Sequence, residues 1–170
     1  MHRAALAVSA VLHTAAVVWA AVRLPARVPV HWSGGLSPDR WGSRTQFVTA
    51  TALVGVGVAA LLVGVAVLLR RIPVRWIDVP YADHWRDPRH EGELRRRLVQ
   101  DALALCTATL LLLAVITLLA VDAATSPQQR LSGWTVVVVV GYLATVLGRV
   151  LWIATVRYRP ADGAAPAVRR

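Results

Sequence analysis

The sequence predicts an all-α, polytopic membrane protein with four transmembrane helices. Of its 170 residues, 56% are hydrophobic and 16% are charged, and the mean hydropathy of +0.54 is too high for an ordinary soluble domain. Four apolar segments each come close to or exceed the roughly 20 residues that cross a bilayer. They cover about residues 4–22, 47–69, 102–121 and 134–156. We therefore expect residues 1–156 to form one transmembrane domain.

The first apolar segment lies between Arg3 and Arg23 and contains no charged residue. A basic start followed by an apolar stretch is also typical of a cleaved signal peptide, but such a stretch is usually about 7 to 15 residues long. The greater length favours an uncleaved helix. His13 lies in the middle of this segment, either as a functional ionisable group or as a neutral ring bonded to a neighbouring helix; we favour the second interpretation.

The loop from residue 24 to residue 44 is rich in proline, glycine and tryptophan. Pro25 and Pro29 push their preceding residues towards extended conformations. Gly34 and Gly35 allow a sharp reversal. The run Ser37-Pro38-Asp39 predicts the start of a short helix or a type I turn. Two tryptophans in this loop suit a position in the headgroup layer of the membrane.

The second apolar segment opens with Ser43 and Gln46 at the spacing of a capping box. Small residues four apart within it, Gly55 with Ala59 and Ala60 with Gly64, predict close packing of a neighbouring helix.

The connection from residue 70 to residue 97 contains eight arginines and five acidic residues. Asp87-Pro88 predicts the cap and first turn of a helix, which we expect to run on into the third segment. Glu91 and Glu93 each precede an arginine by four residues, the favourable order for an ion pair. The arginines are expected to set the topology first, and a binding site for anionic lipid is the second interpretation.

The fourth segment ends near Trp152, and Arg149 lies one turn inside it. We expect this arginine to reach towards the membrane surface as an anchor. Residues 157–170 predict a basic, flexible cytoplasmic tail. With the N-terminus inside, thirteen arginines would lie in cytoplasmic segments and five in outer ones. The positive-inside rule therefore predicts an N-in, C-in protein of the cell membrane, with the 24–44 loop outside.

Several function classes lack support in the sequence. The scattered arginines do not form a nucleic-acid-binding patch, so we expect no nucleic-acid partner. His31 and Asp39 would lie on the opposite side of the membrane from Asp83, His84 and His90, so we expect no metal site. The nucleophile and phosphate-loop motifs are absent, and we expect neither an enzyme nor a cofactor. The single cysteine is expected to be a buried helix residue.

The 24–44 loop also resembles a family signature. The matching residues are Leu24, Pro25, Val28, Pro29, His31, Trp32, Gly35, Asp39, Trp41, Gly42, Ser43 and Arg44. They resemble a bacterial integral-membrane family, the domain of unknown function 1648, which forms the N-terminal part of SdpI-type immunity proteins. Members often have a Tyr-Trp pair and a Pro-Glu-Arg triplet in the next loop. Trp85 and Pro88 match this pattern, whereas His84 replaces the tyrosine and Arg89-His90 replaces Glu-Arg.

The resemblance implies a protein that senses, or gives immunity to, an extracellular peptide or envelope ligand. The expected ligand-binding residues are Pro29, His31, Trp32, Asp39, Trp41 and Gly42. The expected cytoplasmic motif consists of Trp85, Pro88 and Arg89. The alternative is an accessory subunit of a larger membrane complex such as an exporter, and its partner would be another membrane protein or a second copy. An enzyme built around His13 is a third alternative.

Overall fold

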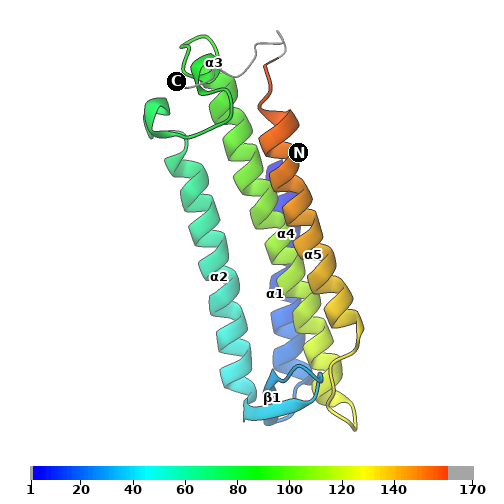
Figure 1. The fold of residues 1–170 in the computed structure, drawn as a ribbon. Coiled ribbons are helices and arrows are strands. Elements are labelled where there is room, and N and C mark those ends of the chain that lie inside the picture. The colour runs from blue at the N-terminus through cyan, green and yellow to red at the C-terminus, as the bar shows by residue number, and fades with distance from the viewer. Residues whose placement is uncertain (1, 161–170) are drawn as a thin grey trace.

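The computed structural model describes residues 2–160, and four long helices dominate it (Figure 1). They are α1 (His2–Arg23), α2 (Arg44–Leu68), α4 (Glu91–Thr125) and α5 (Trp134–Trp152), the last continued by a π-helical turn, η2 (Ile153–Arg157). Each of the four is long and apolar enough to cross a membrane. The predicted all-α, multi-pass architecture is confirmed.

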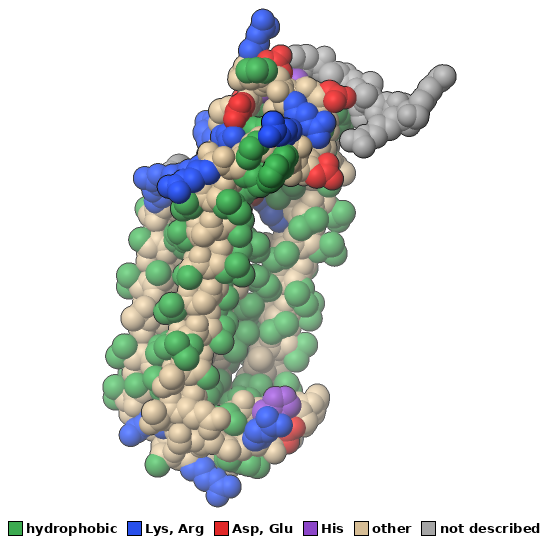
Figure 2. All heavy atoms as spheres, turned by 90° about the vertical axis from the view of Figure 1, so that its left-hand side faces the viewer, with side chains coloured by type: hydrophobic (Ala, Val, Ile, Leu, Met, Phe, Trp, Pro, Cys, Tyr) green, Lys and Arg blue, Asp and Glu red, His purple; other side chains and the backbone are tan. Residues whose placement is uncertain are grey.

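Helix α4 is the centre of the bundle. It packs most extensively against α1 and also contacts α2 and α5 (Figure 1). Most of the surface of α2 and α5 is exposed, as expected of helices whose apolar side chains face lipid. Figure 2 shows charged side chains at both ends of the molecule and apolar ones along the middle of the visible face.

Between α1 and α2 the chain forms an antiparallel hairpin of β1 (Arg27–Trp32) and β2 (Pro38–Ser43), called here the β1–β2 hairpin. The prediction of a short helix or type I turn starting at Ser37-Pro38-Asp39 is therefore wrong. Pro38 is the first residue of β2, a position at which proline, which lacks an N–H, is tolerated in a sheet. The cross-strand contact between His31 and Asp39 stabilises the strand pairing, and local sequence alone could not show it.

The N-cap of the predicted capping box is confirmed at the start of α2. Ser43 is the N-cap, and its hydroxyl accepts a hydrogen bond of 3.0 Å from the backbone N–H of Gln46. Helix α2 therefore begins directly at the end of β2, which fixes the hairpin to the bundle.

At the opposite end, α2 is connected to α4 through a short 3-10 turn, η1 (Val74–Trp76), and a short helix, α3 (Ala82–Trp85). We predicted that Asp87-Pro88 caps α4, and this is wrong. These residues form a separate turn before the helix. The Asp87 carboxylate accepts from the backbone N–H of Arg89 at 2.9 Å, and α4 begins only at Glu91. From there α4 continues unbroken into the third apolar segment, as expected.

Each end of the bundle has its own apolar cluster. At the hairpin end, Leu24 and Val28 pack with Val121 and Ala124 of α4. At the α3 end, Trp85, Leu94 and Tyr158 pack together. Tyr158, which lies within the range predicted as a flexible tail, is buried in this cluster. The rest of that prediction, residues 161–170, lies outside the described residues.

Candidate functional site

The β1–β2 hairpin lies against the loop between α4 and α5, far away in the sequence. Trp32 Nε1 donates to the backbone oxygen of Gln129 at 3.0 Å, and Trp41 Nε1 donates to its side-chain Oε1 at 3.3 Å. The hairpin turn is held as well, because Arg130 Nη2 donates to the Gly35 carbonyl at 3.0 Å. Two tryptophans and one glutamine thus hold the hairpin across the end of the bundle.

The two strands face different surroundings. In β1, Val28 and Pro29 are buried against the bundle. In β2, Asp39, Arg40 and Trp41 are exposed in succession. Strand β2 is therefore the outer strand of the hairpin and presents both charge and an aromatic ring to its surroundings.

An ion pair and an aromatic ring mark this outer surface. His31 Nδ1 lies 2.6 Å from Asp39 Oδ1, and the side chains are 58% and 46% exposed. Trp41 has the Arg27 guanidinium 6.0 Å from its ring centroid, within reach of a cation–π interaction. These two residues and Gln129 line an open pocket of about 350 Å³.

Of the six residues predicted for the outer site, only Trp41 lines this pocket. Pro29 is buried and Trp32 is tied to Gln129, so both stabilise the position of the hairpin. Gly42 has a packing role as well, because a Cβ atom there would lie 2.9 Å from the Val30 side chain. His31 and Asp39 stay exposed beside the pocket, and Trp41 lines it.

The predicted cytoplasmic motif is also divided. Trp85 is buried, and its Nε1 donates to the backbone oxygen of Tyr158 at 2.8 Å. Pro88 and Arg89 are exposed and turn away from that contact. His84 and His90 stack with ring centroids 3.9 Å apart beside Trp85. Trp85 is accordingly a structural anchor between the α2–α4 connection and the end of α5.

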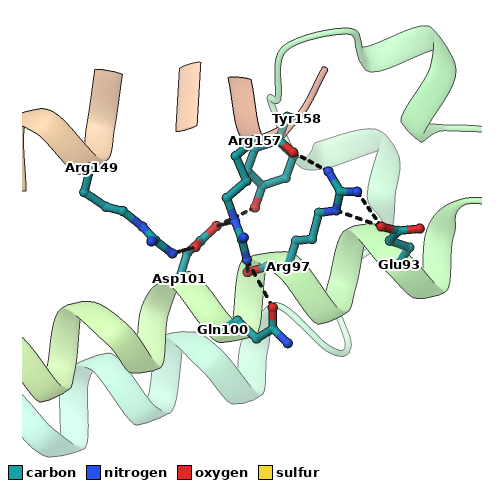
Figure 3. Close-up of polar contacts among 7 residues, drawn as sticks. All are labelled: Glu93, Arg97, Gln100, Asp101, Arg149, Arg157 and Tyr158. Carbon is teal, nitrogen blue, oxygen red and sulfur yellow. Dashed lines mark hydrogen bonds and ion pairs between the residues drawn. The ribbon is translucent and has the colours of Figure 1, made fainter. Parts of the chain in front are cut away.

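The structure brings together a polar cluster that sequence reasoning missed (Figure 3). At its centre the Asp101 carboxylate, 12% exposed, accepts from Arg149, from Arg157 Nε at 2.8 Å and from the Tyr158 hydroxyl at 2.9 Å. The Asp101 cluster comprises Glu93, Arg97, Gln100, Asp101, Arg149, Arg157 and Tyr158. It joins the first turns of α4 to the end of α5.

Tyr158 has a defined role in the Asp101 cluster. Burial and the nearby Asp101 carboxylate raise the pKa of the Tyr158 phenol well above its ordinary value. The phenol therefore stays neutral at physiological pH and remains a hydrogen-bond donor. Because both oxygens of Asp101 accept from donors on α5 and the residues that follow it, the cluster acts as a clamp between α4 and the end of α5.

Arg149 is not the free surface anchor that we predicted, since it pairs with Asp101. The sequence contained one usable signal. An acid at the start of the third segment and an arginine at the end of the fourth lie at the same level when the two helices are antiparallel. Both helices end in charged residues at several positions, so this signal alone could not select the partners.

His13 is buried in the middle of α1, with 6% of its surface exposed. Neither ring nitrogen has a hydrogen-bond partner within residues 2–160, so the predicted bond to a neighbouring helix is not formed. The ring instead fills the space beside Gly55 of α2. In the described part of the chain, no three histidine, cysteine, aspartate or glutamate side chains gather as metal ligands would.

Comparison with known proteins gives one match. No curated protein and no solved structure matches the chain. Residues 8–58 match the family described as "Domain of unknown function (DUF1648)". The match covers most of α1, the whole β1–β2 hairpin and the first part of α2, and includes every position of the 24–44 signature. Residues 8–58 are therefore similar to this family over the hairpin and the adjoining parts of the two helices that flank it.

Proposed function

We propose that this multi-pass membrane protein recognises an extracellular peptide through the outer surface of the β1–β2 hairpin, and so senses or gives immunity to it. The observation that supports this most strongly is the division of the hairpin. One strand is buried and held on the bundle, and the other presents an exposed Trp41 beside a pocket shared with Arg27 and Gln129.

A peptide fits this surface better than a small molecule. The pocket is open and shallow, unlike the enclosed cavities that bury most of a small ligand. A two-stranded sheet also has outer backbone groups that a further extended segment can pair with. The exposed strand β2 offers such an edge. Arg27 and Arg40 beside it favour a peptide that carries acidic groups or a free carboxylate.

The distribution of arginine supports placing the hairpin outside the cell. The end that holds α3 has most of the arginines, and the positive-inside rule assigns that end to the cytoplasm. The Asp101 cluster would then lie at the cytoplasmic surface. The contact between Trp85 and Tyr158 would lie beside it.

The test is a challenge with secreted peptide toxins in a strain that lacks the gene. We expect the strain to be more sensitive to a cognate peptide, and wild-type protein to restore resistance. Trp41→Ala should weaken peptide binding about tenfold or more, because exposed tryptophans in a binding surface contribute strongly to affinity. Resistance should fall accordingly.

Trp76→Ala is the matched control for this challenge. Trp76 is an exposed tryptophan at the opposite end of the molecule, so its removal should leave resistance intact. Equal sensitivity of the deletion strain and the complemented strain to every peptide would contradict the proposal. So would full protection by Trp41→Ala.

An accessory subunit of a larger membrane assembly is the second candidate. No residue is buried in the most apolar 18-residue stretch of α5. Gly141 and Gly148 on this helix also have open space around them. A partner helix could pack closely there. We expect Gly148→Leu to release a stoichiometric membrane partner that the wild-type protein retains in mild detergent; a wild-type monomer under those conditions would argue against this candidate.

A further inference from the structure

A pocket of about 440 Å³ opens at the α3 end of the bundle, on the opposite end from the β1–β2 hairpin. We call it the arginine pocket, and its lining residues are His2, Arg3, Arg70, Arg95, Arg96, Val99, Gln100 and Leu103. Four arginines from α1, from the turn after α2 and from α4 meet here. No acidic side chain lines it among residues 2–160.

The positive charge of the arginine pocket is only partly neutralised. Glu91 pairs with Arg95 at 2.6 Å, and Glu93 lies 3.7 Å from Arg96. Within residues 2–160, no acidic side chain forms an ion pair with Arg3 or Arg70. In the part of the chain that the structure describes, the pocket therefore presents two guanidinium groups without an acidic partner, and guanidinium groups are the usual partners of a phosphate oxygen.

The walls of this pocket are fixed in place. Arg95 Nη1 donates to the backbone oxygen of Leu69 at 2.9 Å, which ties the last turn of α2 to α4. The same bond occupies a carbonyl at the negative end of the α2 dipole, which would otherwise repel an anion. Arg95 is thus held in place, and it holds the end of α2 against α4 before any ligand arrives.

The pocket lies at the level along the helices where the headgroups of a bilayer would be. Arg3 comes just before the apolar part of α1, and Arg70 comes just after that of α2. Val99 and Leu103, nearly buried, continue from the arginines along α4 into the apolar region. One end of the pocket is basic and the other apolar, as an anionic amphiphile requires.

A neighbouring pocket has as many arginines, but their guanidinium groups are bonded differently. It is also about 440 Å³ in volume and has four arginines, Arg96, Arg97, Arg157 and Arg159. Arg97 is bonded to Glu93 and to the backbone of Arg157, and Arg157 is bonded to Asp101 and Gln100. Two of its guanidinium groups therefore already serve the Asp101 cluster.

We propose that the arginine pocket binds the phosphodiester headgroup of an anionic phospholipid, with one acyl chain along Val99 and Leu103. Arg3 and Arg70 bind the phosphate, Arg96 adds to the field, and Arg95 holds α2 against α4. The site is independent of the peptide surface at the other end of the molecule. Free inorganic phosphate has the same charged oxygens as the lipid headgroup. Competition between the two distinguishes a lipid site from a phosphate site.

The test titrates the full chain, purified in mild detergent, with phosphatidylglycerol or phosphatidylcholine of identical acyl chains, and measures bound lipid by native mass spectrometry. We expect phosphatidylglycerol to bind more tightly. Arg70→Gln should weaken its binding about fivefold, and Arg3→Gln should do the same, because each basic group near the membrane surface contributes on that order. Arg71→Gln, the neighbouring arginine outside the pocket, should stay within twofold of wild type.

Two further measurements complete the design. Inorganic phosphate in large excess should displace phosphatidylglycerol only weakly, because it cannot use the apolar end of the pocket. Thermal unfolding of each variant shows that the substitutions leave the fold intact. Equal effects of Arg70→Gln and Arg71→Gln, equal binding of the two lipids, or full displacement by phosphate would each overturn the proposal.

Discussion

His13 and Gly55 show how closely two transmembrane helices can approach at one residue. A Cβ atom at position 55 would lie 2.0 Å from His13 Nε2, a distance that no real contact allows. The predicted role of Gly55 in helix packing therefore has a specific cause. The glycine makes room for an imidazole of the same chain.

Gly55→Ala should lower the free energy of unfolding by about 1 to 3 kcal/mol, because the added methyl group overpacks the α1–α2 contact. Thermal unfolding in detergent measures the change. Gly57→Ala, on the same helix with open space around it, should have little effect. The double variant with His13→Ala should recover part of the loss caused by Gly55→Ala, and simple addition of the two losses would show that the residues are not coupled.

A second prediction at this scale concerns the Tyr158 hydroxyl. Tyr158→Phe keeps the ring in its apolar cluster but removes the donor to Asp101. We expect a loss of about 1.5 to 3 kcal/mol in the free energy of unfolding, the usual contribution of a hydrogen bond to a charged group. Tyr81→Phe, in the same apolar cluster but without a side-chain hydrogen bond among the described residues, is the control. Equal changes in both variants would refute the clamp.

At the scale of elements, the β1–β2 hairpin depends on contacts with the distant α4–α5 loop. Trp32→Phe removes one of the two tryptophan bonds to Gln129 while preserving most of the aromatic surface. We expect backbone amides of β1 and β2 to exchange with deuterium several-fold faster, because the hairpin opens locally more often. Exchange in α2 should be unchanged. An unaltered hairpin would mean that the Gln129 contacts do not hold it.

The same contacts explain which elements could be predicted from the sequence. Segment hydropathy and the Ser43 cap are local signals, so the four helices and the start of α2 were predictable. Pro38 gave a misleading local signal, since a proline can begin a strand as well as a helix. The partners of Trp32, Trp41 and Asp101 lie between 48 and 97 residues away, and single-sequence patterns do not reveal such pairs.

The candidate site could be predicted in part for the same reason. The density of proline, glycine and tryptophan pointed to the loop that contains the exposed Trp41. It could not show that Pro29 is buried and Trp32 partly buried while Trp41 stays exposed, because the surroundings of these side chains include residues far away in the sequence, such as Gln129. Arg27 and Gln129, which complete the pocket, have no motif of their own.

At the scale of the whole molecule, the two ends of the bundle differ in chemistry. One end has the β1–β2 hairpin with the exposed Trp41, and the other has the Asp101 cluster and the arginine pocket. The proposed function requires the hairpin end to face the outside of the cell and the arginine-rich end to face the cytoplasm.

The most direct test is labelling of intact cells with a maleimide that cannot cross membranes. Ser33→Cys lies in the exposed hairpin turn, and Asp78→Cys lies in the exposed connection at the α3 end; the native Cys106 is buried. We predict that Ser33→Cys is labelled in intact cells and that Asp78→Cys is labelled only after the cells are permeabilised. Labelling of Asp78→Cys but not Ser33→Cys in intact cells would contradict the account.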